Sequence, residues 1–155
     1  MKRVLLLAAL GAAVWLAGAA QAQQTAAARL EAALARVAGV EVLSVTLADA
    51  RATGGERVAR VRYVTREIDE FGYRAEALEM FRAAGLALLA GEIDVDVVAL
   101  YSGVTAADWI ERSAARADDL RPFAAGDLTR SDLLARLDTS GLGHSLPGHP
   151  PGSPV

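Results

Sequence analysis

Residues 40–65 decide the fold: VEVLSVTLA occupies residues 40–48, and RVARVRYVT occupies residues 57–65. In both runs apolar and polar side chains alternate with a period of two, which indicates strands with one buried face. The apolar face would hold Leu43, Val45, Leu47, Ala59, Val61 and Tyr63, and the polar face Ser44, Thr46, Arg60 and Arg62. Gly54 and Gly55 lie between the runs and mark a turn. We therefore predict an antiparallel hairpin with one apolar and one polar face.

A long amphipathic helix is predicted after the hairpin, over residues 68–90. Its apolar stripe would be formed by Phe71, Ala75, Leu78, Phe81, Gly85 and Leu88 or Leu89. Acidic residues crowd its start, where the helix dipole favours negative charge: Glu67, Asp69 and Glu70. Gly91 supplies the stop. This helix is the natural cover for the apolar face of the hairpin.

A shorter helix is predicted before the hairpin, over residues 23–37. Its apolar residues recur on one face of a 3.6-residue period: Ala26, Leu30, Leu34 and Val37. Gly39 follows this stripe and is a suitable C-cap. We therefore expect one helix before the hairpin in the sequence and one after it.

Residues 93–101 form a third predicted strand. One face would carry Ile93, Val95, Val97, Ala99 and Tyr101, and the other Asp94, Asp96, Val98 and Leu100. Asp94 and Asp96 would then lie across from Arg60 and Arg62, because opposite charges on neighbouring strands attract.

Residues 109–115 allow two interpretations. Thr105 and Asp108 form a passable capping box, which would start a helix there. The favoured alternative is a fourth strand that pairs with the third. A short helix would then begin at Asp118, with Pro122 in its first turns, because proline cannot lie deep inside a longer helix.

The C-terminal part is expected to hold one more short helix and then a tail. Thr129 and Asp132 form a second capping box ahead of a leucine-rich turn. Residues 139–155 are dominated by glycine, proline and serine, which predicts a flexible tail.

The order of these elements predicts a two-layer α+β sandwich. Its sheet would be mostly antiparallel with three or four strands. The long helix would cover one face of the sheet, and the short helices would come at the C-terminal end. One domain over residues 23–138 is expected between a leader at 1–22 and the tail at 139–155.

The first 22 residues have the three parts of a secretory signal peptide. Lys2 and Arg3 form a positive start, and an apolar run of about 17 residues follows. Ala20-Gln21-Ala22 matches the small-residue cleavage pattern. We therefore expect a bacterial protein that is secreted or periplasmic after cleavage near Ala22. The alternatives are a retained membrane anchor and a buried helix of the fold.

Composition excludes several classes of function. The chain contains no cysteine, which removes thiol catalysis, thiolate metal sites and disulfides. Its formal net charge is −3. Loss of Lys2 and Arg3 with the leader leaves 14 basic against 19 acidic residues, a net charge of −5. This balance argues against nucleic-acid binding.

Candidate chemistry in the sequence is weak. A hydrolase triad needs a histidine held beside its nucleophile, and both histidines, His144 and His149, fall in the predicted tail. Weak metal-ligand or acid–base candidates are Asp94, Asp96 and Glu67. Each has a simpler explanation, as a cross-strand partner of arginine or as helix-start charge. The sequence indicates no cofactor.

The leading functional hypothesis is an exported, non-enzymatic interaction or accessory module of the cell envelope. Its exposed sheet face or sheet edge would bind another protein or an envelope component. Two alternatives come from other classes: a small carboxylate-dependent hydrolase or metal-binding protein, and a module held at the membrane by an uncleaved leader.

Overall fold

A computed structural model of the chain describes residues 21–37, 40–65, 70–103 and 111–138. The first described element is a helix over residues 21–34, called here the N-terminal helix. The elements that follow are β1 (Glu41–Asp49), a 3-10 turn (Arg51–Thr53), β2 (Arg57–Val64), α2 (Glu70–Leu89), β3 (Val97–Gly103), β4 (Glu111–Arg116), α3 (Ala117–Ala125) and α4 (Arg130–Arg136). No helix among these described residues is long and apolar enough to cross a membrane.

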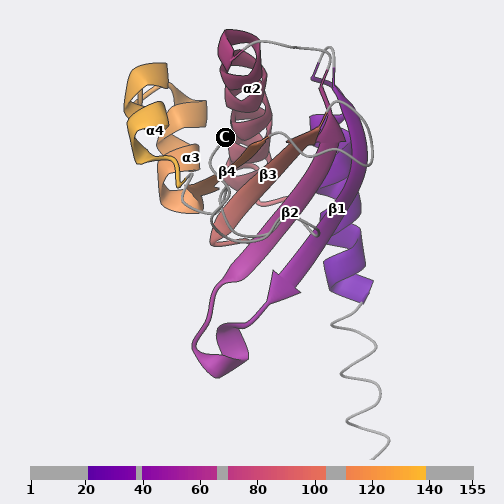
Figure 1. The fold of residues 1–155 in the computed structure, drawn as a ribbon. Helices are drawn as coiled ribbons and strands as arrows, with labels where there is room; N and C mark the ends of the chain where they lie inside the picture. The colour runs from indigo at the N-terminus through magenta and orange to yellow at the C-terminus, as the bar shows by residue number, and fades with distance from the viewer. Residues whose placement is uncertain (1–20, 38–39, 66–69, 104–110, 139–155) are drawn as a thin grey trace, which may run out of the picture.

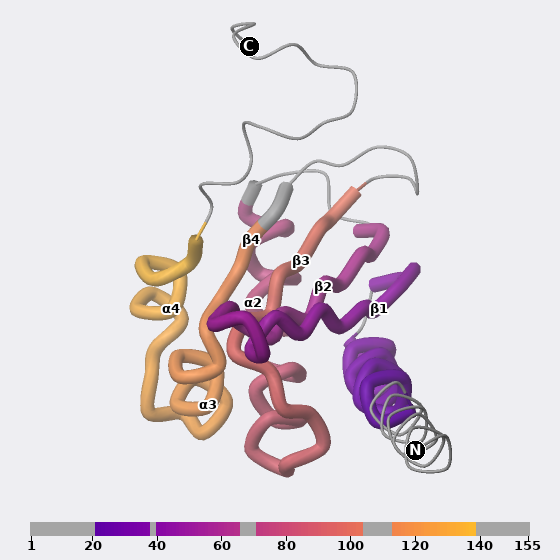
Figure 2. Tube along the Cα trace, turned by 90° about the horizontal axis from the view of Figure 1, so that it is seen from below, coloured from indigo at the N-terminus to yellow at the C-terminus, as the bar shows by residue number. Residues whose placement is uncertain are grey.

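The four strands form one mixed sheet in the order β1-β2-β3-β4. The outer pairs, β1 with β2 and β3 with β4, are antiparallel, whereas the central pair β2 with β3 is parallel. A parallel pair needs a long crossover connection, and α2 supplies it. The predicted two-layer α+β fold with a mostly antiparallel sheet is confirmed. Figure 2 shows the strands in this order, with α3 and α4 on the β4 side.

The hairpin of β1 and β2 forms as predicted, with one irregularity. Gly54 ends the 3-10 turn with φ of 79°, a left-handed conformation that glycine adopts without strain. A bulge between Val42 and Ser44 shifts the register of β1. Leu43, which lies in this bulge, is exposed rather than a member of the apolar face. The expected place of Leu43 in the core is therefore wrong, because a bulge breaks strict alternation.

The helices cover one face of the sheet, and the core lies between the two layers (Figure 1). Leu30 and Leu34 of the N-terminal helix are fully buried, and Ala26 and Val37 pack against the core, as the spacing predicted. The N-terminal helix lies behind β1 in Figure 1 and closes the core on that side.

The long helix α2 lies within the predicted range, and most of its predicted stripe is buried, but the first part of that stripe is not. Phe71 is 85% exposed, and Ala75 is also exposed. Leu78, Phe81, Gly85 and Leu88 are buried as predicted, and the buried face also includes Tyr73, Ala77, Met80, Ala84 and Ala87. Helix α2 packs against both the sheet and α3, so it buries a wider face than one stripe.

The third strand begins later than predicted. Ile93 and Val95 are buried, but the ladder with β2 starts only at Val97, which pairs with Val58. Within β3, Val98 and Leu100 are the residues that point into the core, beside Ala59 and Val61 of β2. The expected assignment of the two faces of this strand is therefore wrong, because the chain changes phase before it enters the sheet.

Strand β4 confirms the favoured interpretation of residues 109–115, although residues 104–110 lie outside the described residues. Helix α3 follows at once and contains Pro122. The capping box that starts α4 is present: the Asp132 N–H donates to the Thr129 hydroxyl, and the Asp132 carboxylate accepts from the Thr129 N–H. After α4, Asp138 forms a bridge with Ala114 and so extends the sheet beyond β4.

The predicted leader and tail lie outside the described residues, apart from Gln21 and Ala22, which belong to the N-terminal helix.

Candidate functional site

Asp94, one of the candidate ligands, is held by two arginines near the turn of the hairpin. Its Oδ2 lies 3.0 Å from Nη1 of Arg51 and 3.3 Å from Nη1 of Arg57. Asp49 completes the cluster, with Oδ2 3.2 Å from Nη2 of Arg51 and 3.4 Å from Nε of Arg57. Two positive and two negative side chains therefore neutralise one another.

The predicted pairing of Asp94 and Asp96 with Arg60 and Arg62 is wrong. Arg60 lies opposite Ala99, and Arg62 lies opposite Tyr101. The two aspartates precede β3 and lie beside Arg57, at the start of β2. The parallel register causes this difference, because it brings the start of β2 beside the start of β3.

Asp96 serves the backbone at this corner. Its Oδ2 accepts the N–H of Arg57 at 2.7 Å, and its own N–H donates to the Arg57 carbonyl at 2.8 Å. Its carbonyl accepts the N–H of Ala117 at 2.9 Å, where α3 begins. Asp96 therefore links β2 to the start of β3 and of α3. This structural role explains an aspartate at this position without any need for a bound ligand.

A polar hollow of about 350 Å³ opens beside this corner and includes both aspartates in its wall. Its other charges are also paired: Arg116 lies 2.7 Å from Glu56, and Arg121 lies 3.2 Å from Asp118. The hydrogen bond from Arg51 is the main cause that holds the pKa of Asp49 below its ordinary range. Likewise, the hydrogen bond that Arg116 donates to Glu56 raises the pKa of Arg116.

This corner does not have the donor set of a metal site. Within residues 21–37, 40–65, 70–103 and 111–138, no three acidic or histidine side chains come together as metal ligands. Glu67, the third candidate, lies outside the described residues, as do His144 and His149. The arrangement can clamp the hairpin turn to the start of β3, and its arginines compete with a cation for the same carboxylates.

Sequence reasoning missed one buried polar contact. The hydroxyl of Thr65 donates to the carboxylate of Glu76 at 3.0 Å, and both residues are buried. The contact ties the end of β2 to α2. No sequence signal could find it, because Glu76 lies between Ala75 and Ala77, on a helix face that looks exposed by periodicity alone.

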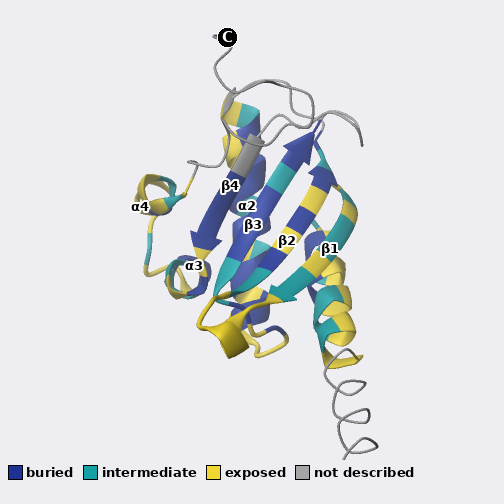
Figure 3. Cartoon of the chain, turned by 60° about the horizontal axis from the view of Figure 1, so that its bottom comes forward, coloured by how far each residue is buried: buried dark blue, intermediate teal, exposed yellow. Residues whose placement is uncertain are grey.

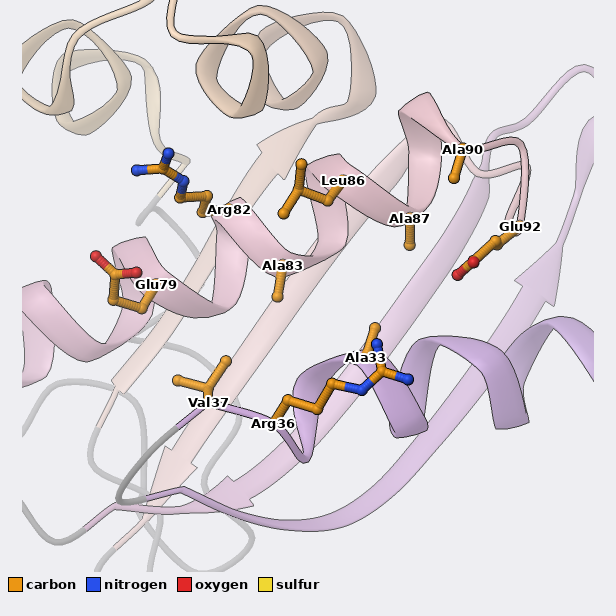
Figure 4. A pocket seen from close by; sticks show the side chains of 10 residues that line it. All are labelled: Ala33, Arg36, Val37, Glu79, Arg82, Ala83, Leu86, Ala87, Ala90 and Glu92. Atoms are coloured by element: carbon orange, nitrogen blue, oxygen red, sulfur yellow. The ribbon is translucent and has the colours of Figure 1, made fainter.

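A groove of about 760 Å³ runs between the N-terminal helix and α2 (Figure 4). Small side chains, among them Ala33, Ala83 and Ala87, form much of its wall. Leu86, which also lines it, is 52% exposed. The groove is mainly apolar, and its lining also includes two arginines and two glutamates: Arg36, Arg82, Glu79 and Glu92.

No described helix covers the sheet face opposite the helices (Figure 3), although Ala99 and Ala114 on the β3 and β4 part of this face are buried. Arg60 lies between Thr46 of β1 and Ala99 of β3 in the register. Both Arg60 and Thr46 are exposed. The open face of β2 therefore presents a guanidinium beside a hydroxyl at this level of the sheet.

The next level of the same face repeats this chemistry. Arg62 is exposed and lies between Ser44 of β1 and Tyr101 of β3. Guanidinium and hydroxyl groups are hydrogen-bond donors, so these two levels form a cationic, donor-rich surface on a chain whose net charge is −3.

Comparison of the chain with protein-family models, with curated proteins and with solved structures finds no significant match.

Proposed function

We propose that this chain is an exported interaction module that binds another protein or an envelope component through its open sheet face. The observation that carries the proposal is the pair of exposed arginines, Arg60 and Arg62, on a sheet face that no described helix covers. An exposed cationic patch on a chain of net negative charge is suited to an anionic partner.

The arrangement of the other charges supports binding rather than catalysis. Among the described residues, Asp49, Asp94 and Asp96 each bond to an arginine side chain or to backbone. A carboxylate held in this way is poorly placed to act as a general base, because its oxygens already accept hydrogen bonds from arginine or backbone donors. The predicted leader adds the location: a protein that acts outside the cytoplasm.

The test is site-specific photo-crosslinking of the mature chain in an envelope fraction from the source organism. A photoreactive residue in place of Thr46, which is exposed on the open face, is expected to give a discrete crosslinked product. The double substitution Arg60→Glu with Arg62→Glu is expected to reduce this product about tenfold or more, because it replaces attraction by repulsion.

Two controls make the result specific. The double substitution Arg36→Glu with Arg82→Glu changes two exposed arginines of the helical layer and leaves the sheet face intact. A photoreactive residue in place of Ala32, on the exposed side of the N-terminal helix, reports non-specific capture. The proposal fails if both photoreactive positions give the same products, or if the sheet and helix arginine variants behave alike.

A further inference from the structure

Strand β1 forms an edge of the sheet, and no described strand pairs with its outer side. The opposite edge differs, because Asp138 exchanges two backbone hydrogen bonds with Ala114 of β4, at 3.1 Å and 2.9 Å. The sheet therefore has one edge that is extended and one that is open among the described residues.

The hydrogen bonds of β2 show which backbone groups of β1 face outward. The Asp96 N–H donates to the Arg57 carbonyl, and the Thr65 N–H donates to the Gly103 carbonyl, so the odd-numbered residues of β2 face β3. The even-numbered residues face β1, and Arg60 pairs there with Thr46. Because backbone direction alternates along a strand, the N–H and C=O groups on either side of Thr46, at positions 45 and 47, point outward.

Beyond the bulge between Val42 and Ser44, this edge lacks the features that normally prevent strand addition. From position 42 to position 48, β1 contains no charged residue and no proline. The side chains of Val45 and Leu47 lie on the core face but are only partly buried, and no described strand lies beyond them. Another extended segment could bury them more fully.

The arginines of the open face belong to β2, the strand next to the edge strand β1. Arg60 and Arg62 are two residues apart, roughly 7 Å along the strand, which is also the spacing of alternate side chains on any extended chain. The residues of β1 between them and the edge are the short Ser44 and Thr46. A long arginine side chain can extend over such short neighbours toward a strand added beside β1.

We propose that an extended segment of a partner protein adds to β1 as an antiparallel strand, with acidic and apolar side chains in alternation. This inference rests on the proposed function and names the partner's chemistry. The apolar side chains lie on the core face, opposite Val45 and Leu47. The acidic side chains lie on the open face, toward Arg60 and Arg62. Backbone hydrogen bonds supply affinity, and the alternating side chains supply specificity.

The outward backbone groups favour a polypeptide over other anions. Positions 45 and 47 each offer an N–H donor and a C=O acceptor. A phosphate polymer or an anionic lipid headgroup supplies acceptors for the arginines and the N–H groups but no matching donors for the carbonyls. Another strand satisfies both kinds of group and the arginines together.

Fluorescence anisotropy with the mature chain and a short labelled peptide of alternating Glu and Val tests this inference. In antiparallel addition, the residues opposite positions 45 and 47 form the hydrogen bonds, and these are the Val residues. N-methylation of the Val residues is expected to abolish binding, whereas N-methylation of the Glu residues leaves it largely intact. Any other pattern overturns antiparallel strand addition.

The arginine variants supply the second readout. Arg60→Gln with Arg62→Gln is expected to weaken peptide binding about tenfold, while Arg36→Gln with Arg82→Gln leaves it unchanged. Thermal unfolding of both variants checks that they fold. Equal effects of the two variants overturn the role given to the sheet arginines.

The remaining outcomes separate this inference from the proposed function. Arginine-dependent binding of inorganic polyphosphate or of anionic vesicles, without binding of the peptide, overturns the strand partner but leaves an anion-binding sheet face. A dimer in sedimentation that the peptide does not dissociate overturns it in favour of a second copy of the chain at β1. Loss of arginine dependence in the envelope crosslinking overturns the proposed function itself.

Discussion

Arg51 shows how single residues organise the corner near the hairpin turn. Its guanidinium bonds to Asp49, two residues earlier, and to Asp94, 43 residues later. Its side chain and its backbone N–H both donate to Asp49, and these two hydrogen bonds are the largest causes of the lowered pKa of that carboxyl. A single side chain therefore links the turn to the approach of β3.

We predict that Arg51→Gln raises the pKa of Asp49 toward its ordinary range. A carboxyl whose pKa is lowered by folding stabilises the fold above its unfolded pKa, and this contribution is lost as pH falls through the folded pKa. The variant should therefore lose less stability between neutral and acid pH than the natural chain does. Carboxyl NMR titration measures the pKa, and urea unfolding at several pH values measures the stability.

The control at this scale is Arg74→Gln, which changes an exposed arginine of α2. It should leave the titration of Asp49 unchanged. An unchanged Asp49 pKa in Arg51→Gln would show that the Arg51 side chain does not control the carboxyl. The aspartates also illustrate the limit of sequence reasoning at this scale: it recognised the residues but assigned them the wrong arginines, since the partners depend on strand register.

At the scale of elements, Gly85 sets the distance between α2 and α3. A Cβ at this position would lie 2.4 Å from the Leu120 carbonyl oxygen and 2.8 Å from the Ala124 Cβ. Neither backbone nor a buried Cβ can move aside without shifting a helix. The two helices approach closely because this position has no side chain.

We predict that Gly85→Ala destabilises the chain, by about 1–3 kcal/mol, because overpacking at a close helix contact forces a backbone shift. In an exposed helix the same change would stabilise by roughly 1 kcal/mol, so the sign itself is the test. Thermal or urea unfolding measures it. Ala75→Gly, on the exposed side of α2, is the matched control for propensity and should cost about 1 kcal/mol. A stabilised Gly85→Ala variant would contradict the close contact.

Elements with strong local signals were predicted well. The alternating hairpin, the N-terminal helix and the capping box at Thr129 all form, since each depends on residues within a few positions of one another. The stripe of α2 was predicted less well, with Phe71 and Ala75 exposed. Several apolar faces are possible on an alanine-rich helix, and the neighbours that select one of them are distant in sequence.

At the scale of the whole molecule, the N-terminal helix contributes to the core and begins beside the predicted cleavage point. Leu30 and Leu34 are fully buried in the shared core, whereas the predicted cleavage point after Ala22 lies near the first described residue of the helix. Removal of residues 1–22 would therefore leave the core contacts of this helix in place. Export and folding are compatible in this arrangement.

We predict that the exported chain begins at Gln23 and unfolds in one cooperative transition. A chain that begins at Val40 should lose that transition, because each buried leucine contributes about 2–5 kcal/mol and total stability is commonly about 5–15 kcal/mol. Mass spectrometry of the exported protein identifies its first residue, and calorimetry compares the two chains. A mature protein that retains its first 22 residues would contradict cleavage, and equal stability would contradict the role of the helix.

The sequence by itself determined most of the elements and their order, including the α+β class and the polar face with Arg60 and Arg62, but it left residues 109–115 open between helix and strand. These features follow from local periodicity, caps and turn residues, which act over a few positions. Only the tertiary structure decided that β2 and β3 are parallel, that Asp94 meets Arg51 and Arg57, and that β1 is an open edge. Those outcomes depend on contacts between residues far apart in the chain. Alternative contacts compete for the same partners, and the packing of the whole core selects among them.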